Sequence, residues 1–158
     1  MACHIRLATV DDAAEISRVV VSALHESNAR DYAPETIARV ARSFTSDRVA
    51  ASIAERQVFV ALERGRPVGT ASRDGAVVRA VFVAPDAQRG GTGRALMAAV
   101  ERAAEEAGVA ALTLQSSLTA VGFYDRLGYR AVRETLHGEE RTIVMAKRLV
   151  PGEADRRS

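Results

Sequence analysis

The sequence has no tryptophan and a single cysteine, Cys3, and aromatic residues make up only 4% of its 158 residues. A lone cysteine cannot form an internal disulfide, and we expect the protein in a reducing cytoplasm. Proteins that bind single-stranded nucleic acids stack bases on aromatic side chains along a positively charged groove. Few aromatics, and charges of both signs spread along the chain, therefore argue against a nucleic-acid-binding module.

Long apolar runs are also missing, and the charges of the two signs nearly cancel. No apolar run approaches the roughly 18 residues of a membrane-spanning helix, and MACHIRLATVDD at the N-terminus lacks the apolar centre of a signal peptide. The net charge of +2 is too small to imply nucleic acid by itself. We therefore expect neither a membrane nor a nucleic acid as partner.

Apolar material for one core is present. Hydrophobic residues make up 47% of the sequence, which suffices for a single domain that we place at 1–150. The polar C-terminal tail at 151–158 is expected to be disordered. Nothing in the sequence decides between a monomer and a homodimer.

Apolar spacing and turn residues predict the order of helices and strands. Helical spacing after Asp12, which forms a capping-box pattern with Glu15, is shown by Ile16, Val19, Val20, Ala23 and Leu24. Further helices are predicted at 32–44, 46–56, 93–108 and 117–128, and strands at 57–62, 67–73, 77–85, 109–116, 129–137 and 141–149. This order predicts an α+β or mixed α/β fold around one sheet, with three consecutive antiparallel strands joined by turns at 63–66 and 74–75.

Glycines gather where a predicted strand leads into a helix, in VFVAPDAQRGGTGRALMAAV at 81–100. Bare N–H groups at Gly90, Gly91 and Gly93, the charges of Arg89 and Arg94, and the helix start would together suit a phosphate, and a diphosphate best. A glycine-rich corner without a ligand is the alternative. The stretch lacks the GK[ST] of a P-loop, and the third glycine and following acidic residue of a dinucleotide fingerprint.

The stretch QRGGTG resembles the Q/R-x-x-G-x-G/A signature of the GNAT N-acetyltransferase superfamily, with Gln88, Gly91 and Gly93 at the matching positions. VFVAP resembles the strand that precedes this signature. SLTAVGFYDRLGY resembles the family's second motif, in which the matching residues are Ala120, Phe123, Tyr124, Gly128 and Tyr129. VMAKRL resembles the M-x-K-x-L ending of many small bacterial members. Two motifs at this separation make the resemblance specific, and it spans nearly the whole chain.

The resemblance implies a mixed, mostly antiparallel sheet, flanked by helices and splayed between its fourth and fifth strands, where acetyl-CoA enters. The main chain of Val81, Phe82 and Val83 would pair with the pantetheine arm like an added strand. The pyrophosphate would be held at the signature, by Gln88, Arg89, Gly90, Gly91, Thr92, Gly93 and Arg94. Ser117 stands where many relatives carry an asparagine that contacts the cofactor, and the alternative is that it caps the next helix. No metal is expected.

The resemblance also implies the chemistry, which is amide formation from acetyl-CoA. Tyr124 matches the family's general-acid tyrosine, whose hydroxyl protonates the departing thiolate. The alternative is a buried tyrosine that packs with Phe123. The acidic residues that many relatives use as a base are replaced here by Arg79 and Gln115, neither of which accepts a proton at neutral pH. Candidate bases elsewhere in the chain are His25, Asp31, Tyr32, Asp74, Glu134 and His137.

The lack of a strong base limits which amines can serve as the acceptor. Deprotonating a lysine side chain at pH 7 costs about 4–5 kcal/mol, whereas an α-amino group costs only about 1 kcal/mol. The site therefore suits an amine of low pKa, or a water chain that ends in a residue from elsewhere. The segments 23–37 and 133–141 are expected to form the acceptor walls, and their mixed charges indicate neither a purely cationic drug nor a long acidic partner.

The leading hypothesis is an acetyl-CoA-dependent N-acetyltransferase that acts on a primary amine of a small molecule or a protein. A non-catalytic acyl-CoA-binding or sensing domain is the alternative, and Arg79 and Gln115 are its best support. Another acyl donor also fits, because the signature indicates CoA and not its acyl chain. Arg79 could also attract an acidic acceptor, or be an ordinary surface arginine.

Overall fold

The computed structural model describes residues 3–88, 90–138 and 140–149. The strands are β1 (His4–Leu7), β2 (Gln57–Glu63), β3 (Arg66–Asp74), β4 (Val77–Val83), β5 (Ala111–Ser117), β6 (Arg130–His137) and β7 (Glu140–Arg148). The helices are α1 (Ala13–Glu26), α2 (Pro34–Ala41), α3 (Ser46–Glu55), α4 (Thr92–Glu106) and α5 (Val121–Arg126). This order confirms the predicted mixed α/β pattern, while the predicted tail at 151–158 lies outside the described residues.

The strands form one sheet in the order β1-β2-β3-β4-β5-β7-β6. All neighbouring strands run antiparallel except β4 and β5, which are parallel. The three consecutive antiparallel strands predicted from the turn signals are therefore confirmed as β2, β3 and β4. A helix connects the parallel pair, because parallel neighbours need a crossover.

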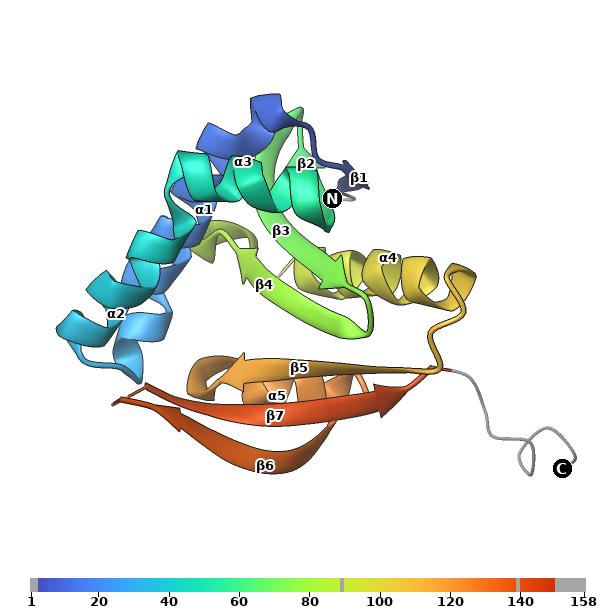
Figure 1. Cartoon of the computed structure of the whole chain (residues 1–158). Helices are drawn as coiled ribbons and strands as arrows, with labels where there is room; N and C mark the ends of the chain where they lie inside the picture. Colours follow the sequence, from blue (N-terminus) through green and yellow to red (C-terminus); the bar gives the residue numbers. More distant parts are fainter. Residues whose placement is uncertain (1–2, 89, 139, 150–158) are drawn as a thin grey trace, which may run out of the picture.

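Helices cover both faces of the sheet (Figure 1), and each face has its own core of buried side chains. The alternation of side chains along β2 separates the two cores. Val58 and Val60 pack with residues of α1, α2 and α3, whereas Phe59 and Ala61 pack with residues of α4 and α5. The apolar residues therefore form two cores, one between each face of the sheet and the helices that cover it.

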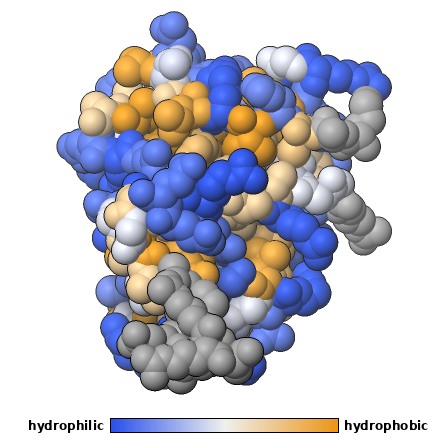
Figure 2. All heavy atoms as spheres, turned by 90° about the vertical axis from the view of Figure 1, so that its right-hand side faces the viewer, coloured by the Kyte–Doolittle hydropathy of each residue, from blue (hydrophilic) through white to orange (hydrophobic). Residues whose placement is uncertain are grey.

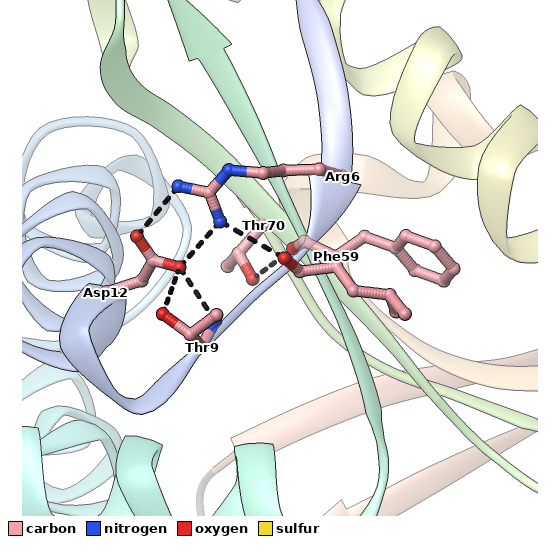
Figure 3. A network of polar contacts seen from close by, with 6 residues as sticks. Arg6, Thr9, Asp12, Phe59 and Thr70 are labelled. Atoms are coloured by element: carbon pink, nitrogen blue, oxygen red, sulfur yellow. Dashed lines mark hydrogen bonds and ion pairs between the residues drawn. The ribbon is translucent and has the colours of Figure 1, made fainter.

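Asp12 holds the entry to α1 in a way that the sequence pattern did not predict (Figure 3). Its carboxylate accepts hydrogen bonds from Arg6 Nη1 at 2.8 Å, from Arg6 Nη2 at 3.1 Å and from the N–H of Thr9 at 2.8 Å. It makes no capping bond to α1, and Glu15 pairs instead with Arg18 at 2.6 Å. The predicted Asp12–Glu15 capping box is wrong, because β1 brings a bidentate arginine to the carboxylate.

The parallel strands β4 and β5 stay paired only where they begin. Val77 pairs with Thr113 and Val78 pairs with Leu114, and the register ends there. Beyond this point the strands diverge, which Figure 1 shows as the opening toward α1 and α2. The predicted splay between the fourth and fifth strands is confirmed.

A β-bulge in β4 marks the point of divergence. Ala80 has φ of +52°, which only a few per cent of residues other than glycine adopt. The Ser72 Oγ donates a hydrogen bond to the carbonyl oxygen of Arg79 at 2.8 Å, and the register with β3 shifts between Thr70 and Ser72. Bulges bend a strand and redirect its groups, so this one turns the rest of β4 away from β5.

The closed end of the split lies toward the right of Figure 1, and Figure 2 shows that side of the molecule. Polar and apolar residues are interspersed on this face (Figure 2). In the described part of the chain, no helix has the length and apolar character needed to cross a membrane.

Candidate functional site

A cleft of about 830 Å³ occupies the opening between β4 and β5. Its lining comes from both strands, from α1 and α2 on one side, from α5 on the other, and from β6 and β7. Predicted site residues that line it are Val81, Phe82, Val83, Gln88, Gly93, Ser117 and Tyr124. The split therefore brings both sequence motifs to one cavity.

The main chain of β4 turns alternate residues toward the cleft. The N–H of Ala84 donates to the carbonyl oxygen of Val68 on β3 at 2.7 Å. Because the groups of successive residues point to opposite sides of a strand, Phe82 also faces β3, and Val81 and Val83 face the opening. The main-chain groups of Phe82 therefore pair with β3, whereas those of Val81 and Val83 remain available, and contacts of this strand with a ligand stay a prediction.

Phe82 has a packing role. Its ring meets the ring of Phe44 edge to face, with the centroids 5.3 Å apart. This contact joins β4 to the segment between α2 and α3 and helps to anchor that helical layer next to the cleft.

Gln88 fixes the corner between β4 and α4. Its Nε2 donates to the Ser27 Oγ at 2.8 Å and to the carbonyl oxygen of Val83 at 3.1 Å. The side chain thus ties the end of α1 to the end of β4. The carbonyl of Val83 keeps a second lone pair toward the cleft.

The start of α4 presents unpaired amides. Gly91 is the residue before the helix, with φ of +81°, and the first helical bond runs from the N–H of Ala95 to its carbonyl oxygen at 3.0 Å. The N–H groups of Thr92, Gly93 and Arg94 therefore have no helical acceptor, as at every helix start. The N–H of Gly90 already donates to Ala87 at 3.2 Å. Among the described residues, positions 91–94 thus keep their amides for the predicted anion site, which stays a prediction.

Arg89 of the predicted site lies outside the described residues. Arg94 is exposed, and Thr92 is buried with its methyl group against Gly69 of β3. No acidic residue occupies the first turn of α4. The described helix start therefore carries positive charge without a competing carboxylate.

Gly93 lets α5 approach the start of α4 closely. A Cβ at this position would stand 3.0 Å from Phe123 Cζ and 3.7 Å from Val83 Cγ2. A contact of 3.0 Å is tighter than nine in ten real Cβ contacts, so a side chain here would make the Phe123 ring give way by a few tenths of an ångström. The second glycine of the signature thus suits the close packing of α5 against α4.

Tyr124 is buried at the inner end of the cleft. Its ring meets Phe123 and Tyr129 edge to face, with centroid distances of 5.0 Å and 5.7 Å. Burial raises the pKa of the Tyr124 phenol far above its usual value. The hydroxyl therefore stays protonated at neutral pH and is a donor, never a base.

Tyr129 differs from Tyr124 in having a strong partner. Its hydroxyl donates to Glu101 Oε2 at 2.9 Å, and Lys147 Nζ donates to Glu101 Oε1 at 3.0 Å. Burial, followed by the charge of Glu101, raises the pKa of Tyr129. This group joins α4 to β7 behind the sheet and does not line the cleft.

Ser117 ends β5 and lines the cleft. Its side chain makes no capping bond to the following turn, and its carbonyl oxygen accepts from Ser116 Oγ at 2.7 Å. The alternative that Ser117 caps the next helix is therefore wrong, and its role toward a ligand stays a prediction.

Only one of the candidate bases reaches the cleft, namely Tyr32. Burial raises the pKa of Tyr32, so its phenolate is not formed at neutral pH. Glu134 is held by Arg141, with oxygen–nitrogen distances of 2.7 Å and 3.2 Å, which lowers its pKa. The exposed side chains of His25, Asp31, Asp74 and His137 do not line the cavity.

Charged residues that the sequence motifs do not mark also line the cleft. They are Arg39, Arg126, Arg133 and Glu140. Arg39 Nη1 lies 3.5 Å from Glu140 Oε1, although 101 positions separate the two in the chain. Arg133 and Glu140 lie in the predicted acceptor wall at 133–141, which named no single residue, whereas no sequence signal marked Arg39 or Arg126.

A set of contacts, here called the strap, ties the α1–α2 connection across the outer end of the cleft. The Tyr32 hydroxyl donates to the carbonyl oxygen of Arg141 at 2.5 Å and accepts from the N–H of Leu118 at 2.8 Å. Thr119 Oγ1 donates to Asp31 Oδ2 at 2.7 Å. Because these partners come from both ends of the chain, the strap holds the two halves of the split together.

Comparison with known families identifies this architecture. The family model described as an acetyltransferase (GNAT) domain matches residues 28–148, which include both motifs and the whole split. The chain belongs to the GNAT acetyltransferase family. Membership confirms the resemblance that the signature at 88–93 indicated.

Relatives and solved structures agree with the GNAT assignment. The chain is 28% identical over 123 residues to the uncharacterized N-acetyltransferase YafP of Escherichia coli K12, and the matched region covers 78% of each protein. A GCN5-related N-acetyltransferase from Rhodopseudomonas palustris superposes with a TM-score of 0.88 at 27% identity, covering 94% of this chain and 96% of that one. The PaiA N-acetyltransferase of Thermoplasma acidophilum, solved with coenzyme A, has the same fold, with a TM-score of 0.79 at 17% identity over 94% of this chain and 99% of that one.

The described residues show no cluster that could serve as a metal site. Within 3–88, 90–138 and 140–149, no three His, Cys, Asp or Glu side chains gather in a way that could hold a metal ion.

Proposed function

We propose that this GNAT protein transfers the acetyl group of acetyl-CoA directly to a primary amine. The observation that carries the proposal is the split itself, in which β4 leaves β5 after Val78 and then leads into the unpaired amides at the start of α4. An extended ligand with a diphosphate at one end matches this arrangement, because its chain can pair with the strand edge while its diphosphate reaches the helix start.

The residues of the cleft fit acetyl-CoA in both charge and shape. The amides of positions 91–94 and the charge of Arg94 would hold the pyrophosphate, which a helix start favours. The main-chain groups of Val81 and Val83 would pair with the pantetheine arm, since they face the opening and not β3. Ser117 and Gln88 border the same path, Gln88 by holding Val83 in place.

Tyr124 supplies the proton in the proposed reaction. The neutral amine attacks the thioester carbonyl, the nitrogen–carbon bond forms, and the carbon–sulfur bond breaks. The thiolate takes the hydroxyl proton of Tyr124, which is replaced by a proton that the amine nitrogen loses. Burial raises the pKa of Tyr124, so its hydroxyl still carries the proton when the thiolate departs.

No described residue provides a strong base for the amine. The cleft holds a single carboxylate among its described lining residues, Glu140, and this lies four residues along β7 from Val144, or about 13 Å of strand. Val144 is level with Gln115, next to the point where the strands part. The acceptor therefore has to arrive with an amine of low pKa, because a lysine-like amine costs about 4–5 kcal/mol to deprotonate at pH 7.

A non-catalytic acyl-CoA-binding domain is the second candidate function. It is favoured by Arg79 and Gln115, which occupy the positions where many relatives carry acids. One experiment separates the two functions. Calorimetry measures CoA binding, and a thiol-release assay with acetyl-CoA is run over primary amines whose pKa values range from about 7.7 to about 10.4.

The enzyme hypothesis expects CoA binding together with thiol release that depends on the amine and is fastest for the amines of lowest pKa. CoA binding without thiol release for any amine of the panel would contradict the enzyme hypothesis and support the non-catalytic function. Absence of CoA binding would contradict both.

A further inference from the structure

The cleft is more positive than the whole chain, whose net charge is only +2. Charged side chains among its described lining residues are Arg39, Arg79, Arg126, Arg133 and Glu140. Arg126 belongs to α5, on the face of the sheet that carries α4 and the proposed pyrophosphate site. The other four lie on the opposite face, toward α1 and α2, where an acceptor would approach.

Two of these arginines stand at the ends of one row of side chains across the sheet. Val78 pairs with Leu114, so the next residues, Arg79 and Gln115, both point to the opposite face. Gln115 pairs with Val144, and Val144 pairs with Arg133. The row runs over β4, β5, β7 and β6. Three strand spacings of about 4.8 Å place its ends at least about 14 Å apart at the main chain, because β4 and β5 begin to diverge here.

Neither arginine of this row is neutralised within the cleft. Arg79 Nε lies 3.5 Å from Asp74 Oδ2, but both side chains are about half exposed, at 49% and 56%, and Asp74 lies outside the cavity. Exposed pairs of this kind contribute little. In the described part of the chain, no carboxylate forms an ion pair with Arg133.

The carboxylates among the described residues of these strands lie away from the row. Glu140, whose Oε1 is 3.5 Å from Arg39 Nη1, lies four residues along β7 from Val144, and Glu134 pairs with Ile143, which packs on the opposite face. A cationic acceptor would thus meet two arginines without a competing carboxylate at the row, and like charges in a partly enclosed cleft repel. An anionic group would instead find planar guanidinium groups, which bind carboxylates and phosphates with two parallel hydrogen bonds.

The strap limits the size of the acceptor. Tyr32 joins the α1–α2 connection to both Leu118 and Arg141, and Asp31 bonds to Thr119. A polypeptide lying across the outer end of the cleft would have to break these bonds. A small molecule can enter beside them.

We propose that the acceptor is a small primary amine that carries a carboxylate or a phosphate, which Arg79 and Arg133 bind while the amine lies toward Tyr124. This substrate class rests on the proposed acetyltransferase function. The nitrogen of the acceptor forms the bond to the acetyl carbon as the carbon–sulfur bond breaks. The sulfur takes a proton from Tyr124, and the amine's surplus proton passes through water to restore the Tyr124 hydroxyl.

Matched pairs of acceptors test the charge. Glycylglycine and glycylglycinamide share an N-terminal amine but differ in a carboxylate, and 2-aminoethyl phosphate and ethanolamine differ in a phosphate. Each is assayed by thiol release at fixed acetyl-CoA, and kcat/KM is compared within a pair after correction for the fraction of neutral amine. We expect the anionic member to be preferred by about tenfold or more in at least one pair. The pair with the larger preference identifies carboxylate or phosphate.

Three variants test whether Arg79 and Arg133 cause the preference for an anionic acceptor. R79Q and R133Q should each lower kcat/KM for the preferred anionic acceptor by about tenfold, and change it for the neutral partner by less than about twofold. R148Q is the matched control, since Arg148 is an exposed arginine at the end of β7 that does not line the cleft. It should leave both rates unchanged.

The outcomes separate the substrate class from the proposed function. Equal turnover of charged and neutral members in both pairs, or a preference that survives R79Q and R133Q, would overturn the anionic acceptor and leave the acetyltransferase standing. CoA binding without thiol release for any amine would overturn the acetyltransferase, and the substrate class with it. Circular dichroism and CoA calorimetry on each variant exclude loss of folding as the cause.

Discussion

Gly91 and Gly108, at the two ends of α4, hold nearly the same backbone conformation, with φ of +81° and +82°. Neither has an atom within 4 Å of the place where a Cβ would stand. A side chain at either glycine thus meets the same left-handed strain without a clash. The two positions differ only in what lies beside them, which is the proposed anion site at Gly91 and the helix end at Gly108.

Gly91→Glu is therefore expected to weaken CoA binding by at least about tenfold, because a carboxylate enters the amides that would hold the pyrophosphate. Gly108→Glu is the control, with a similar cost of about 1–2 kcal/mol in backbone strain and no effect on CoA affinity. Calorimetry with CoA and thermal melts measure both quantities. Equal CoA affinity in the two variants would show that the pyrophosphate does not bind at the start of α4.

Tyr124→Phe should lower turnover by about a hundredfold while CoA binding stays within about twofold, because the ring still packs between Phe123 and Tyr129 and only the proton is lost. Tyr129→Phe provides the contrast. It removes the bond to Glu101 and should cost about 1 kcal/mol of stability with turnover retained. Wild-type turnover for Tyr124→Phe at saturating substrates would make Tyr124 a packing residue only.

The rate of the wild-type protein should keep rising with pH toward the pKa of the acceptor amine. No strong base among the described residues takes the amine's proton, and Tyr124 stays protonated because burial raises its pKa. A series of kcat/KM values from pH 6 to pH 9, with two amines of different pKa, checks this. A plateau at the same low pH for both amines would reveal a base that the cleft geometry does not show.

Stability in acid should depend on Asp12. Its hydrogen bond with Arg6 lowers its pKa, so the folded state holds fewer protons than the unfolded state. The stability it contributes is fully present above the unfolded value of about 3.9 and is lost as the pH falls through the lower folded pKa. Asp12→Asn should lower Tm by about 2–4 °C at pH 6, the shift that about 1 kcal/mol produces in a domain of this size, and by progressively less below pH 4.

Asp47→Asn serves as the control for Asp12, since Asp47 is an exposed carboxylate that forms no ion pair within the described residues. Its Tm should follow that of the wild type across the range. A constant Tm difference for Asp12→Asn from pH 6 down to pH 2 would show that the Arg6 pair carries no linkage to protons.

Tyr32→Phe should loosen the strap, because the variant loses both the bond to the Arg141 carbonyl and the acceptor for the Leu118 amide. We expect KM for the acceptor to rise about fivefold, with CoA binding within about twofold and about 1 kcal/mol of stability lost. Thr70→Val is the matched control, since it removes a buried hydrogen bond to the Phe59 carbonyl at 2.9 Å on β3 (Figure 3). An unchanged KM for the acceptor in Tyr32→Phe would show that the strap does not contribute to acceptor binding.

Local patterns predicted most of this molecule, because helical spacing, strand alternation and turn residues act over a few neighbours. The junction at Gly91 and Gly93 was found in this way, whereas the Phe123–Tyr124 pair and the splay followed from the resemblance to a family. The capping box at Asp12 failed for the opposite reason. Its carboxylate is held by Arg6 of β1, and no local pattern encodes that partner.

The sequence by itself determined which residues could bind an anion or donate a proton, since those properties belong to the residue type and to the strand–helix junction. Only the tertiary structure decided which way they face. Pairing with β3 turned Phe82 away from the cleft and left Val81 and Val83 toward it, because the register of a neighbouring strand sets which main-chain groups stay unpaired. Packing also brought Arg39 to Glu140 across 101 positions of the chain, a contact that depends on how the sheet and its helices assemble and not on spacing along the sequence.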